Sequence, residues 1–300
     1  MSAAAGASSG ADWEVWHAGS DMLGEGPIAH PERASVLWLD ILGMTLSERG
    51  YGDGQARTHA LGVMASAAAL VDRRRVLLAT EVDLRLFDLD TGAVETVMPF
   101  LAGRPDLRSN DARVHPSGAF WIGAMGKRAE PEAGAIWRYH CGALELLYER
   151  ISIPNSIAFA ADGRTAYFAD SARRTIWRVD TDPATGRPSG DPSPFKVFAP
   201  GEGVPDGSVV DADGNLWNAR WGGWSVDAWR PDGRRLDRCA LPVSQPSCPV
   251  FFGKDLDGLL VTTARERMSA AAIAAEPLSG SVLMLRRAVR GVAEPRVRMA

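Results

Sequence analysis

The sequence predicts an all-β fold, a six-bladed β-propeller with four-stranded blades, from a sixfold repeat and the scarcity of helical periodicity. A short phrase, an apolar or aromatic pair followed by small residues, recurs around six marker residues: Trp38, Leu78, Trp121, Tyr167, Trp217 and Val261. Successive markers are 40, 43, 46, 50 and 44 residues apart. A unit of about 45 residues is typical of a propeller blade. A pair of β-sandwiches or a barrel is the alternative, but neither explains a marker that repeats six times.

The elements within each repeat follow a common order. A short apolar strand, such as 157–159, is followed by a turn such as Asp162-Gly163, and then by the marker strand. Asp-Gly favours tight hairpins because glycine adopts positive φ without steric cost. A third strand follows the marker, as at 175–177. Only residues 269–275 have a helical period, so we expect almost no helix.

The composition is that of an ordinary globular domain. The chain has 300 residues, of which 46% are hydrophobic and 23% charged, with a formal net charge of −4. It contains no basic stripe for nucleic acid or anionic lipid and no apolar stretch of about 20 residues, so neither nucleic acid nor membrane is an expected partner. The three cysteines are widely spaced, which fits a reducing cytoplasm. We expect a flexible tail at 1–12 and one propeller domain at 13–300.

Polar residues share one phase of the repeat. Residues 11 to 13 positions before four of the markers are Glu25, Asn110, Asn155 and Asp206. Ser66 and the pair Cys248-Pro249 fall at the same phase of the second and sixth copies. Equal phase in a repeat means equivalent positions in space, and residues that enter the innermost strands surround the central channel. We therefore expect the four polar residues to converge at one channel mouth.

Two carboxylates and two amides at one mouth form an oxygen-rich site of the kind that hard divalent cations prefer. Each residue taken alone could belong to a turn, but four unrelated turns do not explain the shared phase and the complementary chemistry. Arg108 lies two residues before Asn110 and, by strand alternation, faces the same mouth. An arginine there suits a hydroxyl-rich substrate or an oxygen that gains negative charge.

Several short motifs occur in order over roughly residues 20–285: Gly24-Glu25-Gly26-Pro27, Arg108-Ser109-Asn110-Asp111, Phe120-Trp121-Ile122-Gly123-Ala124-Met125, Pro154-Asn155-Ser156, Pro205-Asp206-Gly207-Ser208 and Trp221-Gly222-Gly223. Together they resemble the regucalcin/gluconolactonase family, also called the senescence marker protein family, in the bacterial sugar lactonase branch.

The resemblance implies that Glu25, Asn155 and Asp206 bind one divalent metal, with calcium the first expectation and zinc, manganese, magnesium or ferrous iron the alternatives. It also implies that Arg108 and Asn110 hold the substrate, a sugar lactone such as glucono-, arabino- or xylonolactone, which is opened to the aldonic acid. As our mechanistic hypothesis, Asp206 orients and deprotonates the attacking water. We expect a monomer or a weak oligomer.

Two other functions remain open: a non-enzymatic calcium-binding protein, or a different esterase on the same fold with a more apolar mouth. Ser156 stands where the family usually has glycine, Phe251-Phe252 adds bulk expected near the channel, and Lys127-Arg128 replaces acidic residues of the animal members. These departures concern the choice of lactone. Trp221 and Trp224 are candidates for a wall that faces the sugar.

Overall fold

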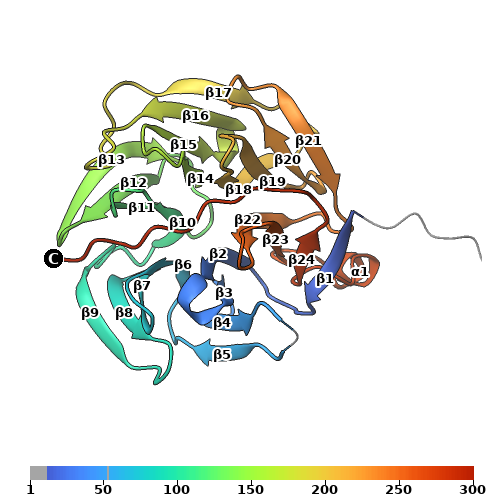
Figure 1. Ribbon diagram of the computed structural model, residues 1–300, viewed down its shortest axis with the longest axis horizontal. Helices are drawn as coiled ribbons and strands as arrows, with labels where there is room; N and C mark the ends of the chain where they lie inside the picture. The colour runs from blue at the N-terminus through green and yellow to red at the C-terminus, as the bar shows by residue number, and fades with distance from the viewer. Residues whose placement is uncertain (1–11, 53) are drawn as a thin grey trace, which may run out of the picture.

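Six four-stranded antiparallel sheets surround a central axis in the computed structural model, which describes residues 12–52 and 54–300 (Figure 1). The predicted six-bladed propeller is therefore confirmed. Residues 1–11, most of the predicted tail, lie outside the described residues. All six marker residues are buried, because each lies in the second strand of a blade between neighbouring sheets.

In the first five blades the strands follow the order of the sequence from the axis outward. The first three blades are β2 (Gly24–His30), β3 (Ser35–Asp40), β4 (Thr45–Gly50) and β5 (Arg57–Ala60); β6 (Ala65–Leu70), β7 (Arg75–Thr80), β8 (Asp83–Asp88) and β9 (Val94–Pro99); and β10 (Leu107–Val114), β11 (Phe120–Gly126), β12 (Gly134–His140) and β13 (Ala143–Ile151). The fourth and fifth are β14 (Pro154–Phe159), β15 (Thr165–Asp170), β16 (Thr175–Asp180) and β17 (Ser193–Val197); and β18 (Val204–Val210), β19 (Leu216–Trp221), β20 (Ser225–Trp229) and β21 (Arg235–Ala240).

The sixth blade joins the two ends of the chain. It consists of β22 (Pro246–Phe252), β23 (Gly258–Thr263), β24 (Val282–Leu285) and, as its outermost strand, β1 (Trp13–His17). The side chain of Trp16 from β1 packs edge-on against Trp38 of the first blade and Phe252 of the sixth. The ring is therefore closed by both hydrogen bonding and aromatic packing.

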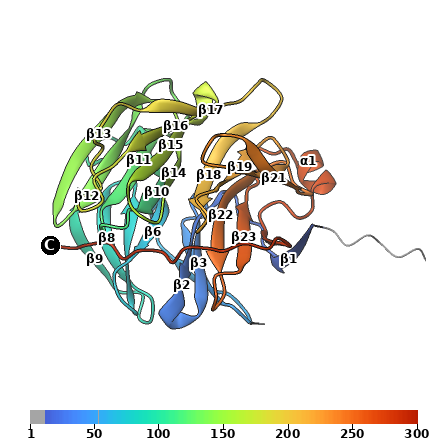
Figure 2. The ribbon, with the colours of Figure 1, turned by 45° about the horizontal axis from the view of Figure 1, so that its top comes forward.

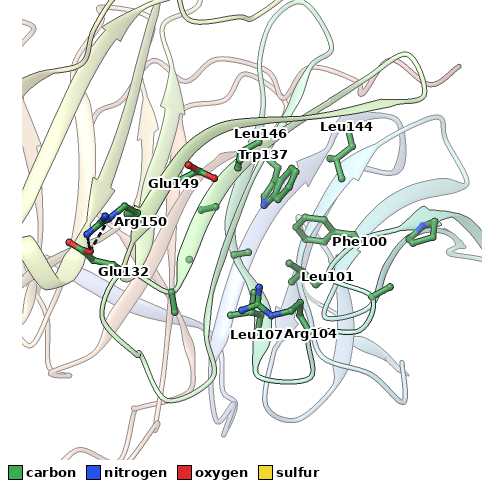
Figure 3. Close-up of a pocket in the computed structure, with 16 residues that line it drawn as sticks. Phe100, Leu101, Arg104, Leu107, Glu132, Trp137, Leu144, Leu146, Glu149 and Arg150 are labelled. Atoms are coloured by element: carbon green, nitrogen blue, oxygen red, sulfur yellow. Dashed lines mark hydrogen bonds and ion pairs between the residues drawn. The ribbon is translucent and has the colours of Figure 1, made fainter.

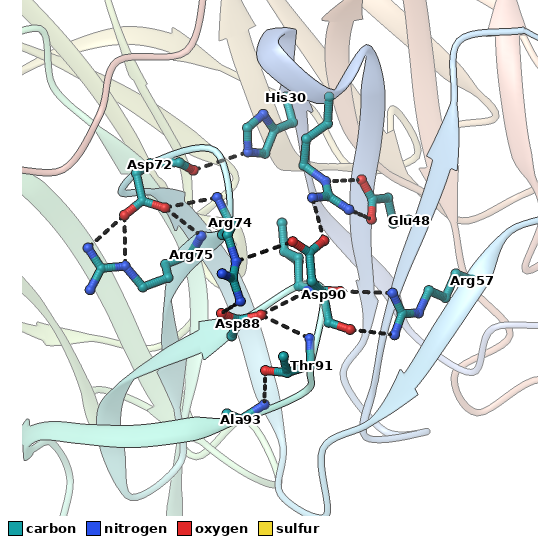
Figure 4. Close-up of polar contacts among 12 residues, drawn as sticks. His30, Glu48, Arg57, Asp72, Arg74, Arg75, Asp88, Asp90, Thr91 and Ala93 are labelled. Atoms are coloured by element: carbon teal, nitrogen blue, oxygen red, sulfur yellow. Dashed lines mark hydrogen bonds and ion pairs between the residues drawn. The ribbon is translucent and has the colours of Figure 1, made fainter.

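A polar network joins the first and second blades at the end of the propeller where their innermost strands finish (Figure 4). Arg33 donates to Glu48 within the first blade at 2.6 Å and to Asp90 of the second at 2.8 Å. Arg57 donates to the carbonyl oxygens of Leu89 and Asp90. These bonds add directional contacts to the apolar packing between the two sheets.

Residues 286–300 cross one end of the propeller, and we call this segment the C-terminal strap (Figures 1 and 2). It is hydrogen-bonded to four blades, through Ala212 N to Arg290 O, Gly291 N to Leu256 O, Val297 N to Leu70 O, and Cys141 N to Arg298 O. Leu70 ends an innermost strand, so the strap covers the end of the channel where those strands finish. Its Glu294 forms an ion pair with Arg113 of β10.

Helical structure is slight. The short helix α1 (Ala270–Ala275) coincides with the predicted segment, and the Ser269 hydroxyl caps it by accepting from Ala272 N at 3.1 Å. Two 3₁₀ turns, Pro31–Arg33 and Ser171–Arg173, complete the helical elements of the described residues. Within the same part of the chain, no helix has the length and apolar character needed to cross a membrane.

Candidate functional site

A cavity of about 240 Å³ lies where the innermost strands begin, at the end of the channel opposite the C-terminal strap. Its lining includes all five of the residues predicted for the site: Glu25, Arg108, Asn110, Asn155 and Asp206. They come from the first, third, fourth and fifth blades. The phase of the repeat therefore identified side chains that line one cavity.

A β-bulge near the start of each innermost strand explains the convergence. Strand pairing is interrupted between Glu25 and Ile28, and at the corresponding place in the other five blades. A bulge redirects a side chain that regular pairing would direct into the sheet packing. Two bulges contain left-handed backbone, at Gly26 (φ 53°) and Ser156 (φ 59°). Gly26 has a second constraint, since a Cβ there would collide with Ser66 O of the next blade.

A chain of hydrogen bonds connects the site residues across three blades. Arg108 Nη1 donates to Asn110 Oδ1 at 2.6 Å, and Asn110 Nδ2 donates to Asn155 Oδ1 at 2.9 Å. Asn155 Nδ2 donates to Ser171 Oγ, whose hydroxyl donates to Pro205 O beside Asp206. The amides are therefore held in fixed orientations before any ligand binds.

The two carboxylates of the site, Glu25 and Asp206, are buried and accept few hydrogen bonds from neighbouring groups. Glu25 and Asp206 are 6% and 5% exposed, and Glu25 Oε2 accepts one hydrogen bond from Gly26 N. No hydrogen bond to the Asp206 carboxylate is found from the described residues. Burial raises the pKa of Glu25, with a further contribution from the charge of Asp111. Burial and then the charge of Glu25 raise the pKa of Asp206. The site thus contains more negative charge than its own groups offset.

These residues fit a divalent cation. Within the described chain no three His, Cys, Asp or Glu side chains are grouped as metal ligands. The candidate site instead combines the carboxylates of Glu25 and Asp206 with the amide oxygen of Asn155, which has a lone pair beyond the one bonded to Asn110. Oxygen donors of this kind suit a hard cation, whose charge would compensate the two buried carboxylates.

Arg108 faces the same cavity as a buried cation. Burial lowers the pKa of Arg108, and Glu266 is the carboxylate that most strongly opposes this shift. Its Nη1 is bonded to Asn110 Oδ1 and to Ser109 O. A guanidinium has five N–H donors, so further donors remain for a ligand.

The sixth-blade position at this phase is Ser247, and the assignment to Cys248-Pro249 was wrong. Pairing is interrupted between Pro246 and Pro249, as it is between Pro205 and Ser208, so Ser247 corresponds to Asp206. Beyond the bulge, each strand of the β22–β23 hairpin is one residue longer than in β18–β19, since Pro249 pairs with Val261 whereas Ser208 pairs with Asn218, and this displaced the count. Ser247 donates to Gly24 O and Ser66 donates to Asn110 O. Both serines therefore join neighbouring blades.

The residues that depart from the family pattern lie in different places, some at the cavity and others in the apolar core or on the surface. Lys127 lines the cavity and pairs with Glu81 at 2.6 Å, whereas Arg128 is exposed. Phe252, expected near the channel, packs against Trp16 and Tyr51 away from the cavity instead. Phe251 packs between the fifth and sixth blades, outside the cavity lining. The cavity lining therefore combines the polar site residues with apolar side chains such as Leu23, Met125 and Ile153, without either phenylalanine.

The two tryptophans considered for a sugar-facing wall differ. Trp221, at the end of β19, lines the cavity. Trp224 is 44% exposed and is absent from the lining. Trp221 is therefore placed to contact a bound ligand.

Sequence reasoning missed the sixth-blade side of the cavity, which is formed by Gln245, Glu266 and Arg267. Two periodic signals were available. First, the residue two positions before each of Glu25, Asn110, Asn155 and Asp206 also lines the cavity; these residues are Leu23, Arg108, Ile153 and Val204. Second, the residue four positions after a marker lines the cavity in three blades, as Met125, Ser171 and Trp221. The first signal, counted back from Ser247, points to Gln245.

A larger cavity of about 580 Å³ lies between the second and third blades (Figure 3). Phe100, Trp137 and Leu144 form its apolar part, and the ion pair between Glu132 and Arg150 lies at its edge. It has no convergent set of buried polar groups, so it is a gap at a blade junction.

Comparison with known proteins agrees with this geometry. The family model described as SMP-30/Gluconolactonase/LRE-like region matches residues 23–265. A protein of Rhizobium meliloti (strain 1021), named as a candidate sugar lactone lactonase, is 42% identical over 92% of this chain and 94% of its own length. The L-arabinolactonase of Azospirillum brasilense is 37% identical over 91% of each chain. A crystal structure from Agrobacterium tumefaciens, described as the calcium-binding protein regucalcin, superposes with a TM-score of 0.93 at 41% identity, covering 95% of this chain and 96% of that one.

Proposed function

The chain belongs to the SMP-30/gluconolactonase family, and we propose that it hydrolyses a sugar lactone to the aldonic acid with the aid of one divalent metal ion. The observation that carries the proposal is the pairing of two buried, uncompensated carboxylates with a buried arginine around one small cavity. The lactonase names of two relatives support the same enzyme class.

Glu25, Asn155 and Asp206 would hold the metal, and calcium is our first candidate because a relative is named as a calcium-binding protein. When bound, the metal would supply Lewis-acid polarisation of the lactone carbonyl. The Asp206 carboxylate, which accepts no hydrogen bond from the described residues, would orient a water and accept its proton as the water attacks the carbonyl carbon. Arg108 would donate to the oxygen that gains negative charge.

Asn110 has little hydrogen-bonding capacity left for a substrate, because most of its donors and acceptors are already bonded within the protein. Both hydrogens of its Nδ2 are bonded, to Pro154 O and to Asn155 Oδ1, and its Oδ1 accepts from Arg108. One lone pair of Oδ1 remains for a ligand hydroxyl. We therefore propose that Asn110 mainly orients Arg108 and Asn155.

The test is proton release at near-neutral pH from glucono-, galactono-, arabinono- and xylonolactone, with metal-stripped protein and with each divalent ion added. We expect at least one lactone to open in a metal-dependent reaction. The near-isosteric Asp206→Asn should reduce kcat by about 100-fold or more, a magnitude typical of a lost general base.

The matched control is Asp232→Asn, because Asp232 is exposed on a turn and pairs with Arg234. This variant should keep wild-type activity. Metal binding without acceleration of any lactone would contradict the lactonase proposal and favour the calcium-binding alternative. The esterase alternative is less favoured, since neither Phe251 nor Phe252 lines the cavity.

A further inference from the structure

The third and sixth blades lie opposite each other in a six-bladed ring, so Arg108 faces the side of the cavity formed by Gln245. Strand register makes the two residues equivalent. In β10, the last residue paired with the next strand before the bulge is Ser109, and Arg108 precedes it. In β22, that residue is Pro246, and Gln245 precedes it. The same position of the repeat therefore supplies a cationic donor on one side and an amide on the other.

The amide of Gln245 has a defined orientation. Its Nε2 donates to Glu266 O at 3.0 Å, which assigns the nitrogen to that side. Its Oε1 is enclosed yet accepts no hydrogen bond in the described structure. A buried acceptor without a donor is uncommon in native proteins, and at a ligand cavity it indicates a donor that arrives with the ligand.

The segment that presents Glu266 is fixed on both sides. Arg265 N donates to Met22 O at 3.1 Å, and Arg265 Nε donates to Ser279 O at 2.6 Å. Arg267 has a left-handed backbone with φ 58°, which directs the chain sharply after Glu266. The Glu266 carboxylate lines the cavity, and Arg267 Nε, at 3.8 Å, is the nearest cation to it. Its oxygens are therefore available as acceptors.

The two sides of the cavity thus have complementary hydrogen-bonding character. Arg108 can only donate, whereas Glu266 in its ionised form and Gln245 Oε1 can only accept. A sugar lactone has the same asymmetry, because its ester group only accepts and its hydroxyl groups donate. We propose that Gln245 and Glu266 form a subsite that binds the hydroxyl groups of the lactone and so selects polyhydroxylated lactones over unsubstituted ones.

This inference rests on the proposed function, and its test compares lactones that share a ring. Glucono-1,5-lactone is paired with δ-valerolactone, which has the same six-membered ring without hydroxyl groups. In Gln245→Met and Glu266→Gln, we expect kcat/KM for gluconolactone to fall about tenfold, mainly through KM, as for the loss of one hydrogen bond. The value for δ-valerolactone should stay within about twofold of wild type.

Glu266→Gln keeps the backbone carbonyl that anchors Gln245, so it separates hydroxyl binding from loss of that anchor. The matched control is Gln55→Met, since Gln55 is exposed on the first blade. Equal losses for both lactones, or no loss for either, would overturn the inference.

If wild-type protein opens no lactone, the proposed function fails and the subsite is tested by calorimetry with gluconate and calcium. Tenfold weaker gluconate binding by both variants would support the subsite. Absence of gluconate binding by the wild-type protein, or equal binding by all variants, would overturn it.

Discussion

At the scale of single residues, buried charge is concentrated near the channel mouth, and not all of it belongs to the candidate metal site. Asp21 precedes β2 and accepts from Trp38 Nε1 at 3.0 Å. Burial, and next the charge of Asp40, raise its pKa to about 7. The folded chain therefore holds this proton to a higher pH than the unfolded chain, and ionisation of Asp21 weakens the fold progressively from about pH 4 to pH 7.

Asp21→Asn removes this ionisation and keeps an oxygen that accepts from Trp38. We expect the variant to gain stability over wild type as pH rises, with the gain about 2 kcal/mol larger at pH 8 than at pH 5. Urea denaturation at the two pH values measures the difference. A gain independent of pH would show that the pKa of Asp21 is not raised in the folded protein relative to the unfolded chain.

At the scale of elements, the bulges of β2, β10, β14 and β18 direct a side chain into the cavity, and the bulges bring neighbouring strands close together. Gly207 follows Asp206 in the bulge of β18, and a Cβ there would collide with the Cys248 side chain of β22. Contact between the backbone of one blade and the side chain of the next leaves no space for a methyl group. The position of Asp206 therefore depends on this glycine.

Gly207→Ala should lower the free energy of unfolding by about 2 kcal/mol, the usual effect of overpacking, and should weaken calcium binding. Gly190→Ala is the control, because a Cβ at Gly190 has no neighbour within 4 Å. Differential scanning calorimetry and calcium titration provide the two readouts. Unchanged stability in Gly207→Ala would contradict the prediction, because it would show that neighbouring blades move apart to accommodate the methyl group without loss of free energy of unfolding.

At the scale of the whole molecule, the C-terminal strap holds blades together at the end of the channel away from the cavity. Its Glu294 pairs with Arg113, and their side chains are only 12% and 10% exposed. Breaking a buried pair by removing one charge leaves the other uncompensated, which costs several kcal/mol.

Glu294→Gln should therefore destabilise the protein by about 3 kcal/mol. Glu32→Gln breaks a different ion pair between the strap and a blade, with Arg296, where both side chains are more than 40% exposed. That change should cost less than about 1 kcal/mol. Thermal unfolding of the two variants compares the pairs, and similar small losses would contradict the importance of the buried one.

The fold and the five predicted site residues could be found from the sequence because the blade repeats and its bulges recur at one phase. The sixth-blade residues were missed for a physical reason. The paired strands beyond the bulge of β22 are longer than those of the fifth blade and shifted the count, so Ser247 and hence Gln245 were not recognised. Glu266 lies in a loop whose path depends on bonds to Met22 and Ser279, which no local pattern predicts. Phe252 was placed wrongly because its packing partners come from β1 and the first blade.

The pairing of β1 with β24 has a consequence for synthesis on the ribosome. Trp13 is synthesised about 270 residues before its partner Leu285. Contacts between such distant residues slow folding, because the chain must close a very long loop to form them. The sixth blade cannot be completed until β24 has been synthesised. The nascent chain therefore leaves the apolar edge of its first blade unsealed until then, and that exposed edge can associate with other chains.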